Sequence, residues 1–409
     1  MLLGPSVAIA GQEPHAPESD TPVEAAAPRP DTRTQYPAFL INSYFGVDAG
    51  YLDYGFSERL LEPGFHVERI TVPHAAARVT LFGHEFNQNV SAQLTYMRPV
   101  QYVTYTNVNG DGSAHHVWAN FGGLTMRARV PIARRTRLYG EGGLGITSRH
   151  GFPVGAVHPT VRDAHYASFL AGGGVERSVT PAWDLTAGAL YSPGDARVAE
   201  PRALMISGGF RYTMRALSDD VVDANRLAAF SFPLNLLRVE YSTGYGYAIN
   251  TFLSDRVPVF WGGNVHVDRG VAVHYDRGVF HTEKIFALEL GASVSSWRSQ
   301  ADRNEFFTLS AYPLFRFTWL RTRAADAYFC YSLAGPTYIS RVTVDGLDTG
   351  HHFTFQDFMG AGVFLGRHRS VEAGVKINHY SNGNIFTENA GLKIPVTLVI
   401  GYSFPRFQG

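Results

Sequence analysis

The stretch VEAGVKINHYSNGNIFTENAGLKIPVTLVIGYSF, from Val371 to Phe404, decides the fold. It contains two alternating runs joined by a polar connection rich in Gly and Asn. Because successive side chains of a strand point to opposite faces, the first run has one apolar and one polar face. The apolar row consists of odd-numbered residues: Val371, Ala373, Val375, Ile377, His379 and Ser381. We therefore expect two strands, the first ending with an imidazole and a hydroxyl on its apolar side.

A histidine and a serine side by side on one face are the beginning of an activated nucleophile. The imidazole of His379 would act as general base for the hydroxyl of Ser381. The spacing alone is a weak motif, because His and Ser near strand ends are usually interface or turn residues. The remainder of the chain has to give it a context.

The composition is typical of a transmembrane β-barrel. The 409 residues include 35 basic and 35 acidic ones, and this zero net charge gives no electrostatic reason to expect nucleic acid as a partner. Charged residues make up only 17%, while 42 Gly, 28 Phe, 21 Tyr and 5 Trp are present. No run approaches the 18 apolar residues of a membrane-spanning helix. Short alternating runs with low charge and many aromatics favour a barrel with an apolar outer face over a soluble β-sandwich.

Two sets of alternating runs predict two tandem eight-stranded antiparallel barrels. The first set is Phe39–Tyr54, Ala75–His84, Val90–Thr106, His116–Ile132, Arg137–Thr147, Ala167–Thr180, Ala182–Ser192 and Ala203–Met214. The second set, with one broken run near Asp268, is Leu234–Tyr247, Val257–Val267 with Gly270–His274, Lys284–Trp297, Phe306–Trp319, Ala327–Ile339, Asp357–Leu365, Ser370–Ser381 and Lys393–Phe404. The last run is expected to place Ile394, Val396, Leu398, Ile400, Tyr402 and Phe404 on one face.

Between the two sets, Ala216–Ser231 breaks the alternation with three Asp residues and a helix-compatible composition. A single sixteen-stranded barrel would need no such interruption, although a long loop would look the same. The expected organisation is a signal-like, Pro-rich segment at 1–36, a barrel of unknown role at 37–215, a linker at 216–231 and a second barrel at 232–409. The first barrel shows no constellation comparable to His379 and Ser381, and His150 and His158 in loop-like sequence are given no function.

Motifs of the second barrel resemble the outer-membrane lipid A 3-O-deacylase family. They are Phe355-Gln356-Asp357, Gly360-Ala361-Gly362, His379-Tyr380-Ser381-Asn382 and Asn389-Ala390-Gly391, followed by an alternating terminal strand. The resemblance is strongest over Thr354–Phe404 and does not cover the first barrel. It implies a barrel in the bacterial outer membrane that removes the ester-linked 3-hydroxyacyl chain from lipid A. Ser381 would be the nucleophile, His379 the base, and Asn382 and Asn389 the oxyanion and substrate-positioning groups.

The third member of the triad departs from the family. Its glutamate falls at Lys393 when the connection is counted forward, or at Ile394 when it is counted back from the last aromatic residue. Glu388 is the nearest carboxylate and is expected to reach His379 through a flexible connection. Glu372 on the opposite face and Asp357, taken as two strands away, are weaker candidates.

The expected function is therefore a serine esterase acting on lipid A or lipopolysaccharide, without a metal or other cofactor. A non-catalytic outer-membrane barrel with a degenerate triad, structural or forming a narrow pore, is the alternative. A role in protein binding, with one barrel holding the other or a partner chain, is the third interpretation.

Overall fold

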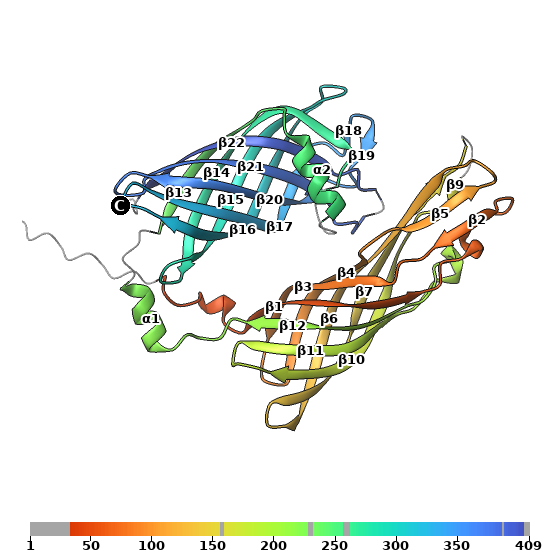
Figure 1. The fold of residues 1–409 in the computed structure, drawn as a ribbon, viewed down its shortest axis with the longest axis horizontal. Coiled ribbons are helices and arrows are strands. Elements are labelled where there is room, and N and C mark those ends of the chain that lie inside the picture. The colour runs from red at the N-terminus through yellow and green to blue at the C-terminus, as the bar shows by residue number, and fades with distance from the viewer. Residues whose placement is uncertain (1–32, 156–158, 228–231, 257–261, 387, 405–409) are drawn as a thin grey trace, which may run out of the picture. The chain divides into compact units, whose positions relative to one another are not determined.

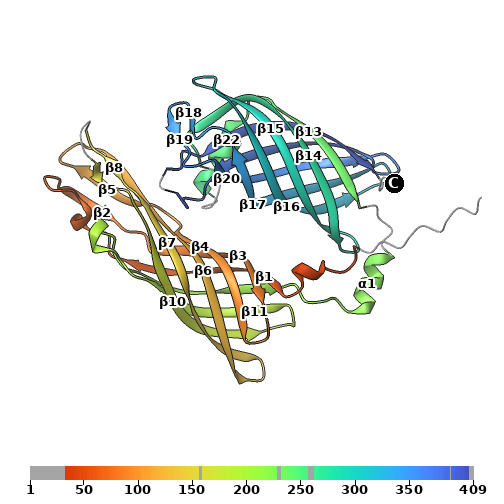
Figure 2. The same cartoon turned by 180° about the vertical axis from the view of Figure 1, so that it is seen from behind.

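The protein forms two closed eight-stranded antiparallel barrels, which confirms the predicted fold class. The computed structural model describes residues 33–155, 159–227, 232–256, 262–386 and 388–404 (Figures 1 and 2). His158 and most of the signal-like segment expected at 1–36 lie outside these residues. None of the described helices is long and apolar enough to cross a membrane.

The first barrel is an up-and-down meander in which each strand pairs with the next along the chain. Its strands are β1 (Ser43–Tyr54), β3 (Ala75–Glu85), β4 (Val90–Pro99), β6 (Ala114–Ala133), β7 (Thr136–His150), β10 (Ala164–Ser178), β11 (Trp183–Ser192) and β12 (Ala203–Thr213). The connections at one end also contain β2 (Val67–Thr71), β5 (Val103–Val108), β8 (Phe152–Pro153), β9 (Pro159–Val161) and the 3-10 turns η2 (Glu58–Leu60) and η3 (Ala196–Val198). The turn η1 (Ala38–Leu40) precedes β1.

One predicted strand of this barrel is interrupted. The run Val90–Thr106 is interrupted, because β4 ends at Pro99 and β5 begins at Val103; both pair antiparallel with β6, so the chain continues in the same direction. β5 pairs with β6 and β2 and extends the sheet beyond the barrel. Alternation continues across the interruption, so the pattern alone did not reveal it.

The second barrel has the same simple order and closes between its first and last strands. Its strands are β13 (Asn235–Ser242), β14 (Val265–His281), β15 (Phe286–Ser299), β16 (Glu305–Arg321), β17 (Ala325–Ile339), β20 (Phe353–Leu365), β21 (Val371–Ser381) and β22 (Leu392–Phe404). Helix α1 (Asp219–Arg226) precedes β13, α2 (Tyr247–Arg256) follows it, and the pair β18 (Thr343–Val344) and β19 (Leu347–Asp348) follows β17.

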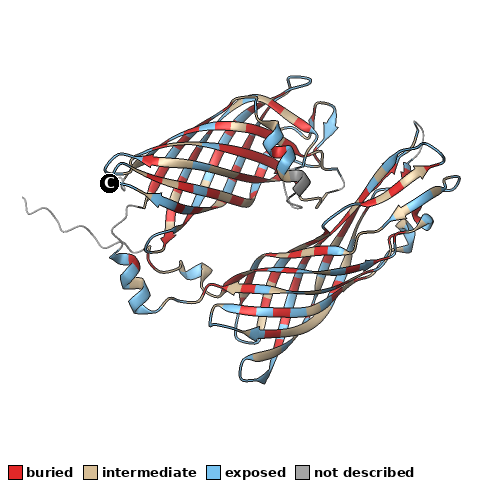
Figure 3. Ribbon diagram, in the orientation of Figure 1, coloured by how far each residue is buried: buried red, intermediate tan, exposed pale blue. Residues whose placement is uncertain are grey.

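Buried and exposed residues alternate along the strands of both barrels (Figure 3). Exposed outward residues are apolar, with Leu144 at 68% and Ile400 at 69% among the most exposed. The connections are short at one end of each barrel and mostly longer at the other, as in outer-membrane barrels with periplasmic turns and extracellular loops. β7 and β21 both end at the end with the long connections.

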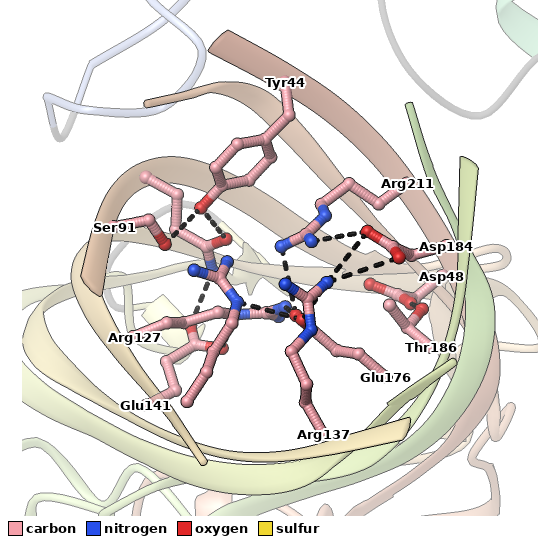
Figure 4. A network of polar contacts seen from close by, with 12 residues as sticks. Tyr44, Asp48, Ser91, Arg127, Arg137, Glu141, Glu176, Asp184, Thr186 and Arg211 are labelled. Carbon is pink, nitrogen blue, oxygen red and sulfur yellow. Dashed lines mark hydrogen bonds and ion pairs between the residues drawn. The ribbon is translucent and has the colours of Figure 1, made fainter. Parts of the chain in front are cut away.

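Charged side chains pair inside the first barrel. Glu176 lies 2.9 Å from Arg129 and 3.1 Å from both Arg127 and Arg211. Figure 4 shows the guanidinium groups of Arg127 and Arg211 pointing toward carboxylates of this interior. Asp184 lies 2.6 Å from Arg211. Because an uncompensated buried charge is costly, each carboxylate in this network is matched by more than one cation.

We expect Glu176→Ala to lower the free energy of unfolding by about 3–5 kcal/mol, because it leaves three buried guanidinium groups without their shared partner. Urea unfolding of the protein in phospholipid vesicles, followed by tryptophan fluorescence, measures the loss. The control is Glu58→Ala, which removes an exposed glutamate of η2. Equal unfolding midpoints for the two variants would contradict a structural role for the network.

The second barrel has a similar charged interior. Arg238 lies 2.8 Å from Asp276 and 3.3 Å from Glu372, and Arg316 lies 2.7 Å from Glu289. Toward the end with the long connections, the interior becomes apolar. The residues of this apolar cluster are Val265, Val267, Ala272, Trp297, Phe306, Ile339, Val344, Tyr380, Leu392 and Ile394. This cluster supports the end of β21 from inside, directly behind the row that carries His379 and Ser381.

Candidate active site on the outer wall of the second barrel

His379 and Ser381 occupy the outward row of β21, as the sequence predicted. Earlier members of this row, Val371 and Val375, are 44% and 46% exposed. The alternate, even-numbered residues of β21 face inward, since Glu372 contacts Arg238 and Lys376 forms an ion pair with Glu240. The row therefore changes from apolar to polar near the end of the strand, where the long connection begins.

Asp357 lies directly opposite His379 on the neighbouring strand β20, and the expectation that it lies two strands away is wrong. β20 and β21 form a hairpin in which Leu365 pairs with Val371 and Asp357 pairs with His379. Cross-strand partners share a face, so Asp357 also points outward. The carboxylate oxygen Oδ2 lies 3.6 Å from Nδ1 of His379, within ion-pair distance but beyond that of a hydrogen bond.

A β-bulge in β17 fixes the carboxylate of Asp357. The pairing of β17 with β20 shifts between Ser332 and Gly335, and Ala334 within the bulge has a positive φ of 53°. Its backbone N–H donates a hydrogen bond of 2.6 Å to Oδ1 of Asp357. Bulges often re-aim groups beside functional sites, and here the bulge supplies a donor that holds one carboxylate oxygen while the other faces His379.

A second irregularity, in β22, decides which residue flanks His379 on its other side. The β21–β22 register shifts between Lys376 and Asn378, so that Lys393 pairs with His379. Ile394 is buried in the interior cluster, whereas Leu398, Ile400 and Tyr402 face outward. The expectation that Ile394 shares a face with these three residues is therefore wrong, because an extra residue in one strand reverses the faces beyond it.

The imidazole of His379 is buried, and its second nitrogen, Nε2, also contacts a neighbouring group. Nε2 lies 2.7 Å from the carbonyl oxygen of Gly262, in the segment that precedes β14. A carbonyl oxygen only accepts hydrogen bonds, so Nε2 carries a proton in this arrangement. Transfer of a proton from Ser381 to Nε2 requires that this contact be released first.

The connection after Ser381 is built around asparagine side chains. Nδ2 of Asn382 donates to the carbonyl oxygens of Thr349 at 3.0 Å and Glu388 at 2.6 Å, and its backbone N–H donates to Oδ1 of Asn389 at 3.0 Å. These bonds use the Asn382 amide to brace the loop. The Glu388 side chain is exposed, and in the described ranges its carboxylate makes no contact with the imidazole of His379.

A tight turn follows within this connection. Ile385 N–H donates to the carbonyl oxygen of Asn382 at 3.1 Å, and the two central residues, Gly383 and Asn384, have φ values of 64° and 59°. Two successive left-handed residues define a type I′ turn, for which Gly and Asn are the favoured residues. The turn places the backbone N–H groups of Gly383 and Asn384 shortly after the serine.

No metal centre accompanies the site in the part of the chain that the structure describes. Three or more His, Cys, Asp or Glu side chains do not converge there in the way that a metal ion requires. The chemistry available at the site is that of a hydroxyl, an imidazole, a carboxylate and backbone amides.

Two closed barrels with apolar outer walls, polar interiors and one end of long connections define an outer-membrane β-barrel protein. The model of the PagL family, lipid A 3-O-deacylase, matches residues 269–403. This match lies in the second barrel and includes β20, β21 and most of β22. It confirms the resemblance expected for the C-terminal half and the location in the bacterial outer membrane.

Solved outer-membrane proteins resemble this chain at low identity. The outer-membrane enzyme PagL is 16% identical, with a TM-score of 0.31, and the match covers 42% of this chain and 99% of that one. Neisserial surface protein A is 17% identical, with a TM-score of 0.28 and coverages of 42% and 97%. The N-terminal barrel domain of OprF from Pseudomonas aeruginosa is 13% identical, with a TM-score of 0.28 and coverages of 42% and 98%. Among curated proteins, no sequence matches this one.

Proposed function

We propose that the second barrel hydrolyses the ester of the 3-O-linked hydroxyacyl chain of lipid A. Ser381 is the nucleophile, His379 the general base and Asp357 the carboxylate that orients the imidazole. The observation that supports the proposal is the pairing of Asp357 on β20 with His379 on β21. His379 shares its outward row with Ser381. The family match over residues 269–403 supports the substrate.

The reaction follows the usual order of acyl transfer by a serine. Nε2 of His379 takes the hydroxyl proton while Oγ of Ser381 attacks the ester carbonyl carbon. Collapse of the tetrahedral intermediate breaks the bond to the sugar oxygen, which receives the proton from the imidazolium. Water then attacks the acyl-serine ester with His379 again as base, and a 3-hydroxy fatty acid leaves. The Asp357 carboxylate stabilises the imidazolium through Nδ1.

The oxyanion needs hydrogen-bond donors that are not already used. The side chain of Asn382 is committed to Thr349 and Glu388, so the backbone N–H groups of Gly383 and Asn384 are better candidates. Neither N–H has a hydrogen-bond partner within the described part of the chain. Asn389 retains a positioning role, since its side chain bonds the backbone of Asn382 and the Asn384 side chain at 2.6 Å.

In this proposal the orienting carboxylate comes from β20, whereas the family resemblance places it on β22, on the other side of β21. The lysine at 393 is in register with His379 on β22, where a cation cannot stabilise an imidazolium. Asp357 on β20 takes over this role in the proposal. Glu388 is not required by the mechanism.

Incubation of the purified protein with lipid A in detergent tests the proposal. We expect a 3-hydroxy fatty acid in the extract, quantified by gas chromatography with mass spectrometry, in an amount equal to the monodeacylated lipid. Lipid A whose 3-O chain has been removed beforehand by mild alkali serves as the control substrate. Release of no acid from intact lipid A, or the same release from both lipids, would overturn the assignment.

A non-catalytic outer-membrane barrel is the second candidate. It is favoured by Lys393 beside His379 and by the contact of Nε2 with the Gly262 carbonyl, which keeps this nitrogen from acting as a base. This candidate predicts no covalent labelling of Ser381 by a serine-reactive fluorophosphonate, whereas the deacylase predicts labelling that disappears in His379→Ala.

A further inference from the structure

The end of β7 in the first barrel carries a second group of hydroxyl and imidazole side chains. Its outward row runs through Leu144 and Ile146 to Ser148 and His150. As on β21, an apolar row ends in a serine and a histidine two residues apart, at the end of the barrel with the long connections. The expectation that His150 lies in a loop is wrong, because His150 is the last residue of β7.

The neighbouring strand completes the group. His165 of β10 pairs with Ser148 in the sheet register, and its Nδ1 lies 2.9 Å from Oγ of Ser148. Just before β10, Asp163 places Oδ1 3.1 Å from Nδ1 of His150. The backbone N–H of Gly151 donates to the same carboxylate oxygen at 2.7 Å and holds it in place.

A hydrogen-bonded serine and histidine are not by themselves a site in this protein. Ser43 and His84 form a cross-strand pair of similar geometry, 3.0 Å from Oγ to Nδ1, at the end of the first barrel with the short turns. Within the described residues, no carboxylate contacts His84, whereas the β7–β10 pair lies beside a second histidine, His150, which Asp163 contacts. Ser148 thus differs from Ser43 in two ways. It lies beside a second histidine and an aspartate, and it lies at the end of the barrel with the long connections.

The second group is not a copy of the first. β7 is the fifth strand of its barrel, whereas β21 is the seventh of the other. The order of the residues is also reversed, with the serine before the histidine. Each barrel thus has a serine, a histidine and a carboxylate near the end of an outward row, but on different strands and in a different order.

We propose that Ser148 is an activated nucleophile of a second esterase-type site, which acts on acyl esters of membrane lipids at the outer surface of the first barrel. A neutral His165 with its proton on Nε2 accepts the Ser148 hydroxyl proton at Nδ1 as Oγ bonds to the ester carbonyl carbon. The half-exposed His150, oriented by Asp163, donates to the developing oxyanion. Cleavage of the ester C–O bond sends the proton from His165 to the departing alcohol, and water then releases the acid.

A long-chain alkyl fluorophosphonate tests this site on the full-length protein in detergent. The reagent forms a covalent adduct with activated serines, and mass spectrometry of the digested protein locates the adduct. Ser381→Ala is the background of choice, because it leaves Ser148 as the candidate serine and separates the result from that of the second barrel. We expect an adduct on the Ser148 peptide and none on the Ser43 peptide.

Two further variants show whether the neighbouring groups activate the serine. His165→Gln keeps a hydrogen-bonding side chain but removes the base, and we expect labelling of Ser148 to slow at least tenfold. Asp163→Asn is expected to slow it less, because His150 is retained. Absence of the adduct on Ser148, equal labelling of Ser43, or an unchanged rate in His165→Gln would each overturn the proposal, whatever happens at Ser381.

Discussion

Replacing His379 with alanine is expected to lower the rate of lipid A deacylation by up to about 10⁶-fold, because the nucleophile then loses its only general base in the mechanism. The turnover number should fall while the Michaelis constant stays nearly unchanged, since the imidazole contributes to the transition state more than to binding. Time courses of 3-hydroxy acid release at several lipid A concentrations measure both quantities.

His352→Ala is the matched control for this variant. His352 lies near the same end of the same barrel, and its ring nitrogen Nδ1 is 2.7 Å from the carbonyl oxygen of Ile339. Its removal takes away an imidazole without touching the proposed triad and should leave the turnover number within a few-fold of the original. Loss of activity in His352→Ala as large as in His379→Ala would indicate a structural effect at this end of the barrel.

Replacing Asp357 with asparagine is expected to lower the turnover number by up to about 10⁴-fold, again with little change in the Michaelis constant. The amide keeps the hydrogen bond from Ala334 but does not stabilise the imidazolium, and the loss of the corresponding carboxylate in a serine protease has an effect of this size. Glu388→Gln should leave the rate nearly unchanged, since its carboxylate is not needed.

The register of β22 offers a rescue of the Asp357 variant. Lys393→Glu introduces a carboxylate at the position paired with His379 on the opposite flank. In the Asp357→Asn background, this second change should restore at least a tenth of the lost rate, whereas Lys393→Gln should restore much less. A purely structural role for Asp357 predicts no rescue by either change, and an unaltered rate in Asp357→Asn would remove it from the mechanism.

The alternation of apolar and polar residues predicted most of the fold. Alternation and run count predicted both barrels, because burial on one face and exposure on the other impose that pattern on every strand. What it did not reveal were events that leave alternation intact. β4 and β5 read as one run because Val103 and Tyr105 continue the pattern beyond the interruption after Pro99, and the bulge in β22 shifts the faces by one residue without a change in composition.

The site was predictable where it depended on a single strand. Parity alone placed His379 and Ser381 on the outward row of β21. Asp357 was also within reach of sequence reasoning, because the short connection after Leu365 fixes a hairpin register that pairs it with His379. Asp357 ranks only as a weaker candidate in the sequence because it is taken to lie two strands away from His379.

Other parts of the two sites had no local sequence signal. The left-handed backbone of Ala334 is unusual for a residue with a Cβ, and nothing around it in the sequence indicates a bulge. In the first barrel, Ser148 and His150 show the same spacing as the motif on β21. Their partners His165 and Asp163 follow a long connection, across which strand register cannot be derived from the sequence.

The mass spectrum of lipid A after parallel incubation with the unaltered protein and with Ser381→Ala tests the central claim most directly. The proposed mechanism predicts the loss of one 3-hydroxyacyl group with the unaltered protein and an unchanged lipid with Ser381→Ala, both proteins being folded in detergent. An unchanged spectrum with the unaltered protein, or the same loss with Ser381→Ala, would contradict it.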